Sequence, residues 1–166
     1  MAEPVRIPRP SPRLLPLEAR ALLELAALLP AYPFLRRAPS GDGHPVLVLP
    51  GFMASDFSTR ALRRFLRDKG YAAHGWKLGR NVGPSESVIA AMVERVRELQ
   101  SRYDRRVSLI GWSLGGIYAR ELARRHPADV RQVITLASPF RDLTATNVPQ
   151  FLQRRRPPMP DACSRP

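Results

Sequence analysis

The stretch that decides the fold is GWSLGG, at residues 111–116. A short apolar run at residues 107–110 precedes it, and residues 117–123 follow with a helical pattern. A strand that turns abruptly into a helix around G-x-S-x-G is typical of a nucleophile elbow, in which the serine stands on a tight turn. The glycines let the strand and the helix pass closely without a Cβ clash. The motif predicts that Ser113 is a nucleophile, and the alternative is an ordinary glycine-rich connection.

Apolar runs and helical segments alternate along the chain. Strands are predicted at residues 46–49, 71–74, 107–110 and Val130–Leu136. Between them, helices are predicted after residue 58 with a stop at Gly70, over 85–102, and over Leu114–Arg125. This order predicts an α/β fold, a mostly parallel sheet with helices on both faces. Ligands of such sheets bind beyond the carboxyl ends of the strands, so the loops at 50–56, 75–84 and 138–142 should meet Ser113 on one rim.

The two ends of the chain carry a different pattern. Residues 1–13 are rich in proline and predict a disordered leader. Residues 14–29 predict a helix that stops at Pro30 and packs on the sheet, with a membrane-surface role as the less supported alternative. Residues 154–166 predict a basic, proline-rich disordered tail. A single, incomplete domain over residues 14–153 is expected.

The chain is strongly basic, with 27 Lys and Arg against 14 Asp and Glu and a formal net charge of +13. The basic residues are scattered, and their clusters lie on the polar faces of predicted helices, so nucleic acid is not the expected partner. Cys163 is the single cysteine, which leaves no disulfide or cysteine-based metal site within one chain, and no cofactor is expected. Neither a transmembrane segment nor a signal peptide is predicted, and a cytoplasmic location is the default.

Three motifs together resemble one family. HPVLVLPGF at residues 44–52, GWSLGG at 111–116 and TLASPF at 135–140 are similar, in order and spacing, to the α/β-hydrolase superfamily, and within it to bacterial esterase/lipase-type members. The resemblance covers roughly residues 17–150. It implies a partial α/β-hydrolase fold and hydrolysis of small-molecule or lipid carboxylic esters, through an acyl-enzyme on Ser113.

The resemblance also implies an oxyanion hole. The backbone N–H of Leu114, directly after the nucleophile, is one donor, and the loop after the first central strand supplies the other. Alignment of the family's His-Gly-X loop with residues 50–52 favours Phe52, with Met53 as the alternative, and places Pro50 where the family usually has histidine. Trp112 and Phe140 are candidates for an acyl pocket, together with Phe52 and Met53, although all four are equally ordinary packing residues.

A general base and its orienting acid are not identified by the sequence. In this family both follow the serine, and His126 is the only later histidine. It should lie about 18 Å away at the far end of a helix of twelve residues. His44 precedes its strand, and His74 should lie one strand too far to the side, so structural roles are favoured for both.

The late carboxylates do not complete the site. Asp129, Asp142 and Asp161 stand in no family-like context. The base and the acid are therefore unknown, and the plainest interpretation is a hydrolase truncated before its last strands. The alternatives are a non-catalytic hydrolase-like binding protein, an inactive fragment, or a subunit completed by another chain. A truncated domain would leave Val130–Leu136 as an unprotected edge strand and lower the stability. Oligomeric state and ester chain length stay open.

Overall fold

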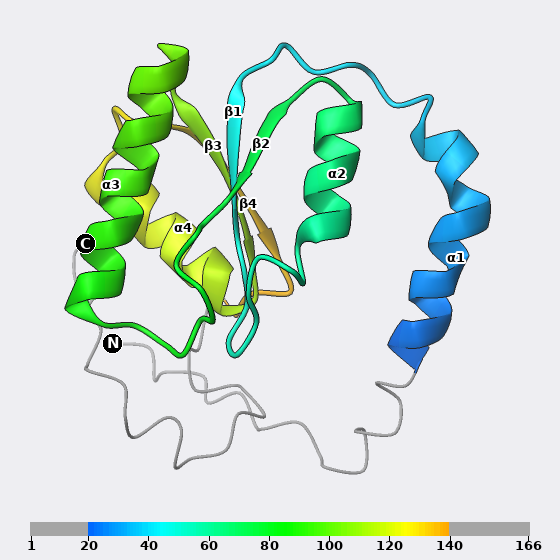
Figure 1. Ribbon diagram of the computed structural model, residues 1–166, viewed down its shortest axis with the longest axis horizontal. Coiled ribbons are helices and arrows are strands. Elements are labelled where there is room, and N and C mark those ends of the chain that lie inside the picture. The colour runs from blue at the N-terminus through cyan, green and yellow to red at the C-terminus, as the bar shows by residue number, and fades with distance from the viewer. Residues whose placement is uncertain (1–19, 140–166) are drawn as a thin grey trace, which may run out of the picture.

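The computed structural model describes residues 20–139 of the chain (Figure 1). Its helices are α1 (Arg20–Leu35), α2 (Arg60–Asp68), α3 (Glu86–Tyr103) and α4 (Leu114–Arg125), and its strands are β1 (Pro45–Leu49), β2 (Ala72–Gly75), β3 (Val107–Trp112) and β4 (Val130–Leu136). The predicted termini, residues 1–13 and 154–166, lie outside the described residues.

The strands form a parallel sheet in the order β2-β1-β3-β4. The carboxyl ends of all four therefore point to the same edge, which lies at the bottom of Figure 1. The predicted α/β class and the alternation of strands and helices are confirmed. Strand β1 is central, as its β-branched, apolar sequence predicts, and is buried along its whole length.

Alternate residues of β1 build the two halves of the core. Leu47 and Leu49 pack with Leu109 against apolar side chains of α3 and α4. On the other face, Val46 and Val48 pack with Ile110, and Leu62 and Leu66 of α2 cover them. Because side chains alternate across a strand, this pattern places α3 and α4 on one face of the sheet and α2 on the other (Figure 1).

Helix α1 departs from its prediction. It runs from Arg20 through Pro30 and Pro33 to Leu35, so the predicted stop at Pro30 is wrong. A proline inside a helix removes one N–H donor and crowds the preceding turn, which is why a stop was expected. The helical bonding nevertheless resumes after both prolines, where the Arg36 N–H donates to the Tyr32 carbonyl at 2.9 Å.

The expected packing of this helix on the sheet is also not seen. Helix α1 lies beyond α2 in Figure 1, away from the strands. The Tyr32 hydroxyl donates to Asp68 of α2 at 3.1 Å, and the Lys69 ammonium donates to the Arg36 carbonyl at 2.7 Å. The end of α1 is thus held to the end of α2. Among the helices described, none has the length and apolar content needed to cross a membrane.

Strand β4 forms one edge of the described sheet. Within residues 20–139 it pairs only with β3, and its side chains beyond Val130 are mostly exposed, with Ile134 at 42% and Leu136 at 38%. This arrangement agrees with the prediction of an open edge at β4. A strand edge with unpaired N–H and C=O groups is a template for association.

Candidate functional site

Ser113 occupies the turn between β3 and α4. Its backbone lies at φ 51° and ψ −118°, in a region that residues with a side chain rarely adopt. A conformation of this kind costs on the order of 1–3 kcal/mol and persists only where the surrounding structure enforces it. The strained backbone is what the elbow motif predicts for its serine.

Close backbone approach explains the glycines of the motif. A Cβ at Gly111 would lie 2.2 Å from the Gly115 carbonyl oxygen, and a Cβ at Gly115 would lie 2.3 Å from that of Leu49. A Cβ at Gly116 would lie 1.9 Å from the Ser138 hydroxyl. The first two contacts are with backbone atoms, which no side-chain rotation can move aside. The glycines therefore let β3, α4 and the end of β1 meet at one point.

Hydrogen bonds from β4 and the segment after it fix the turn. The Ser113 N–H donates to the Leu136 carbonyl at 2.8 Å, and the Ser113 carbonyl accepts from the Ser138 hydroxyl at 2.7 Å. The Gly116 N–H donates to the same carbonyl at 3.0 Å. Both backbone polar groups of Ser113 are thus occupied. Ser138 was not singled out by the sequence, although the TLASPF motif contains it.

The loop after β1 lies against Ser113. A Cβ built on Gly51 would be 3.4 Å from the Ser113 Cβ, so Phe52 directly follows a residue that lies beside Ser113. The Met53 N–H, the alternative oxyanion donor, donates to the Asn81 carbonyl at 2.7 Å. Leu114 is the first residue of α4, where N–H groups lack helical partners and the helix dipole favours negative charge. Leu114 and Phe52 stay the predicted oxyanion donors, with Met53 as the alternative.

The same loop is held at its far end by Asp56. The Asp56 carboxylate accepts hydrogen bonds from the backbone N–H groups of Trp76 and Lys77, both at 3.0 Å. A Cβ at Gly75 would lie 2.3 Å from an oxygen of that carboxylate, so the contact requires glycine there. The loops after β1 and β2 therefore form one connected rim, as the parallel topology predicts.

His44 lies at the amino end of β1 and is buried. Its Nε2 is 2.8 Å from the Ser108 hydroxyl, and its Nδ1 hydrogen-bonds to Asp42. The order Ser–His–Asp is that of a catalytic triad, but Ser108 is only 1% exposed, in the middle of the sheet. Arg131 and His44 hold the pKa of the Asp42 carboxyl well below its usual range. We interpret the cluster as structural, because substrate has no access to Ser108.

His74 is engaged on the α3 side of the sheet. Its Nε2 is 2.9 Å from the Tyr103 hydroxyl, at the end of α3 that leads into β3. Burial lowers the pKa of His74 to about 4, and the nearby cations, Arg95 first among them, act in the same direction. The imidazole is therefore neutral at neutral pH.

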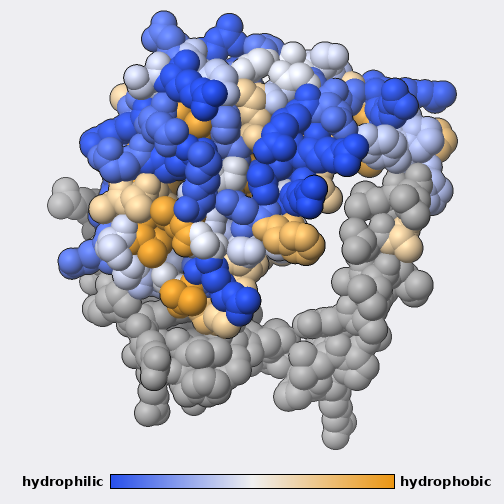
Figure 2. All heavy atoms as spheres, viewed as in Figure 1, coloured by the Kyte–Doolittle hydropathy of each residue, from blue (hydrophilic) through white to orange (hydrophobic). Residues whose placement is uncertain are grey.

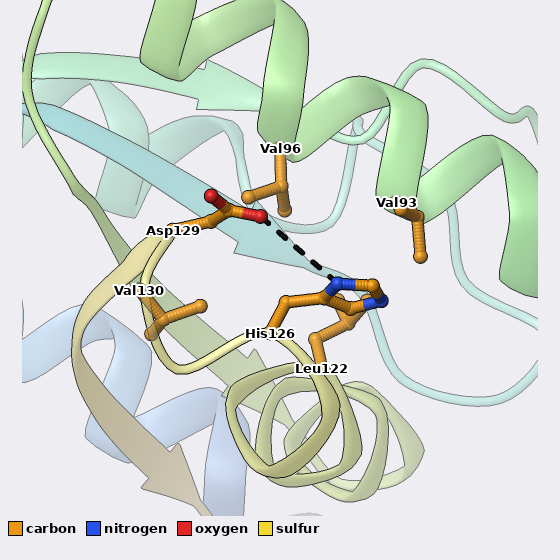
Figure 3. A pocket seen from close by; sticks show the side chains of 6 residues that line it. All are labelled: Val93, Val96, Leu122, His126, Asp129 and Val130. Atoms are coloured by element: carbon orange, nitrogen blue, oxygen red, sulfur yellow. Dashed lines mark ion pairs between the residues drawn. The ribbon is translucent and has the colours of Figure 1, made fainter.

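His126 follows the last residue of α4, which runs antiparallel to the strands and ends at the edge opposite Ser113. Its Nδ1 lies 4.0 Å from a carboxylate oxygen of Asp129. Figure 3 shows this pair above Leu122, in a small apolar hollow between α3 and the start of β4. His44, His74 and His126 are the three histidines of the chain, and the structure brings none of them to the elbow.

The candidate pocket residues are only partly described. Trp112 is 48% exposed at the end of β3, and Met53 is 46% exposed, whereas Phe52 is half-buried and packs against the core. Phe140, Asp142 and Asp161 lie outside the described residues. Figure 2 shows apolar residues gathered low on the visible face, toward the carboxyl edge, beneath a hydrophilic upper part. Within residues 20–139 no three His, Cys, Asp or Glu residues come together as metal ligands.

Comparison with known proteins identifies the family. A model of the alpha/beta hydrolase family matches residues 46–165, and the chain belongs to that family. No match was found among curated proteins.

Solved structures give partial matches. Bacillus licheniformis lipase BlEst2 in its mature form is 24% identical, over 62% of this chain and 44% of that one, with a TM-score of 0.49. A probable hydrolytic enzyme of Pseudomonas aeruginosa PAO1 is 20% identical, over 61% of this chain and 35% of that one, with a TM-score of 0.47. The chain thus spans less than half the length of either protein.

Proposed function

We propose that this chain carries the nucleophile and the oxyanion hole of a carboxylic-ester hydrolase of the esterase/lipase type. The observation that carries the proposal is the positive-φ backbone of Ser113, held at the meeting point of β1, β3 and α4 by glycines that leave no room for a Cβ. Strain of this kind is a mark of functional sites, where the surrounding structure enforces it. The substrate class, a small-molecule or lipid ester, follows from the resemblance of the motifs.

In the proposed reaction the Ser113 Oγ attacks the carbonyl carbon of the ester while its proton is removed. The tetrahedral intermediate places its oxyanion between the N–H groups of Leu114 and Phe52, and its collapse expels the alcohol and leaves an acyl-enzyme. Water then attacks the acyl group, which releases the carboxylic acid and regenerates the serine. Each oxyanion donor is worth about 2.7–4 kcal/mol of transition-state stabilisation in enzymes of this kind.

Proton removal limits the rate that this chain can reach. Because none of its three histidines lies at the elbow, the base and the acid have no assigned residue. Serine hydrolases that lack a triad member retain about 10³–10⁴-fold acceleration over water, from the oxyanion hole and binding. We therefore expect slow acylation of Ser113 and still slower turnover.

A second candidate is a non-catalytic hydrolase-like binding protein or an inactive fragment, which the placement of the histidines favours. Turnover of p-nitrophenyl butyrate by the wild-type chain and by Ser113→Ala separates the two. Release of up to one equivalent of nitrophenolate by the wild type, absent in Ser113→Ala, supports the hydrolase. Equal background rates in both proteins would overturn it and leave the binding protein or fragment. A cytoplasmic location and the lack of a nucleic-acid partner stay predictions.

A further inference from the structure

Asn81 is fully buried in the loop after β2, with 0% of its surface exposed. It stands beside the loop that follows β1, the loop that carries Phe52. A buried amide must find partners for both its N–H₂ and its carbonyl group. Apart from Gly83 in its own loop, the partners of Asn81 belong to the proposed oxyanion loop or to the helix that follows the elbow.

Three hydrogen bonds tie Asn81 to residues 50–54. Its side-chain Nδ2 donates to the Pro50 carbonyl at 2.9 Å. Its backbone carbonyl accepts from the Met53 N–H at 2.7 Å, and its backbone N–H donates to the Ala54 carbonyl at 2.8 Å. Phe52 lies between Pro50 and Met53, so Asn81 holds the backbone on both sides of Phe52.

The other side-chain atom orients the amide. Asn81 Oδ1 accepts from the Tyr118 hydroxyl at 3.3 Å and from the Gly83 N–H at 3.2 Å. Tyr118 belongs to α4, the helix whose first residue is Leu114. Asn81 thus connects the loop carrying one proposed oxyanion donor to the helix carrying the other.

The loop needs such support because its conformation is strained. Met53, directly after Phe52, has φ 59°, a value that residues with a side chain rarely adopt. Met53 is also 46% exposed, so packing of its side chain contributes little to holding that backbone. The hydrogen bonds from Asn81 restrain this turn, together with the bond from the Ala54 N–H to the Gly51 carbonyl at 3.2 Å.

We propose that Asn81 is a positioning residue, which holds residues 50–54 so that the Phe52 N–H is presented to the oxyanion. The inference rests on the proposed function of Ser113. It assigns no chemical step to Asn81, which acts only through the loop. Loss of the Nδ2–Pro50 bond should let the loop relax and weaken the oxyanion hole.

The variant that tests this is Asn81→Asp, which keeps the shape and the accepting oxygen and, as a carboxylate, removes the donor to Pro50. The control is Tyr118→Phe, which removes one donor to Oδ1 and leaves the Pro50 bond in place. Circular dichroism checks that both fold. Acylation of Ser113 is then measured with p-nitrophenyl butyrate and with its thionoester, because sulfur accepts hydrogen bonds from backbone N–H groups more weakly than oxygen.

We expect the ratio of the ester to the thionoester acylation rate to fall at least ten-fold in Asn81→Asp, because loss of one whole oxyanion donor lowers the rate about 10²–10³-fold. In Tyr118→Phe the ratio should change less than three-fold. A merely structural defect lowers both rates together and leaves the ratio unchanged, and that result would overturn the proposal.

A second readout separates this inference from the proposed function. If wild-type Ser113 is not acylated, the proposed function fails, and amide hydrogen exchange then decides the role of Asn81. Exchange in a peptide covering residues 50–57 should speed up at least ten-fold in Asn81→Asp, while a peptide covering residues 92–103 keeps its wild-type rate. Unchanged exchange in residues 50–57 would refute the positioning role of Asn81.

Discussion

Replacement of Gly115 by alanine tests the close approach of β1, β3 and α4. Gly115 is the second residue of α4, a position where alanine is ordinarily well tolerated. Here the new Cβ would lie 2.3 Å from the Leu49 carbonyl oxygen and 2.8 Å from that of Pro50. Both contacts are with backbone, so no side-chain rotation relieves them, and either α4 or the end of β1 must move.

The cost follows from the geometry of the contact. Adding a methyl group to a packed site costs about 1–3 kcal/mol, and a rigid backbone neighbour favours the upper end. For a chain of this size, about 3 kcal/mol lowers the melting temperature by about 6–12 °C. A displaced loop would also slow acylation of Ser113, since Gly51 and Phe52 follow Pro50 directly.

The matched control is Gly79→Ala. Gly79 has φ +75° but nothing within 4 Å of its added Cβ, so Gly79→Ala carries a backbone penalty of about 1–2 kcal/mol and no steric one. Gly115 does not have a positive φ, so Gly115→Ala carries the steric penalty alone. Thermal unfolding followed by circular dichroism compares the two variants with the wild type. The reasoning is refuted if Gly115→Ala melts at the wild-type temperature or no lower than Gly79→Ala.

Three further predictions concern strain, pH and the sheet edge. Ser113→Gly should be more stable than Ser113→Ala in thermal unfolding, because only glycine relieves the strain at φ 51°; equal melting temperatures would count against strain at the elbow. The pKa of His74 is about 4 in the folded chain and 6.5 when unfolded, so the unfolded state binds more protons between these pH values, and the free energy of unfolding should fall as the pH drops from 6.5 towards 4. Urea titrations at pH 7 and pH 4.5 measure this fall, which should be smaller in His74→Gln than in the wild type. An equal fall in both proteins would contradict the assignment. Ile134→Lys, on the exposed edge strand β4, should reduce concentration-dependent association in light scattering, whereas Arg64→Lys on α2 should not; identical behaviour would show that β4 does not drive association.

The sequence predicts the sheet well because each strand and helix carries a strong local pattern. Strand β1 is a run of buried apolar residues, and α3 is preceded by the cap residue Ser85, whose hydroxyl accepts from the Val88 N–H at 3.2 Å. The elbow could also be predicted, since its glycines are required by contacts that the motif itself brings about.

Other features of the structure depend on contacts between distant segments, and the local sequence around them does not predict these contacts. Asn81 looks like an ordinary turn residue in a glycine-punctuated loop, and only the fold brings it beside Pro50, 31 residues earlier. Helix α1 contradicts the local rule for proline, although its end is bonded to α2. The pairing of His44 with Ser108, across 64 residues, was equally hidden.

The central claim is that Ser113 is the nucleophile, and covalent labelling tests it most directly. The full chain is incubated with a fluorophosphonate, and the modified residue is located by peptide mass spectrometry in the wild type, Ser113→Ala and Ser108→Ala. Ser108 is the informative control, because it lies 2.8 Å from His44 Nε2 in a triad-like arrangement yet is buried. We predict one adduct, on Ser113, that is lost in Ser113→Ala and kept in Ser108→Ala; an adduct that persists in Ser113→Ala, or no adduct in the wild type, would contradict the account.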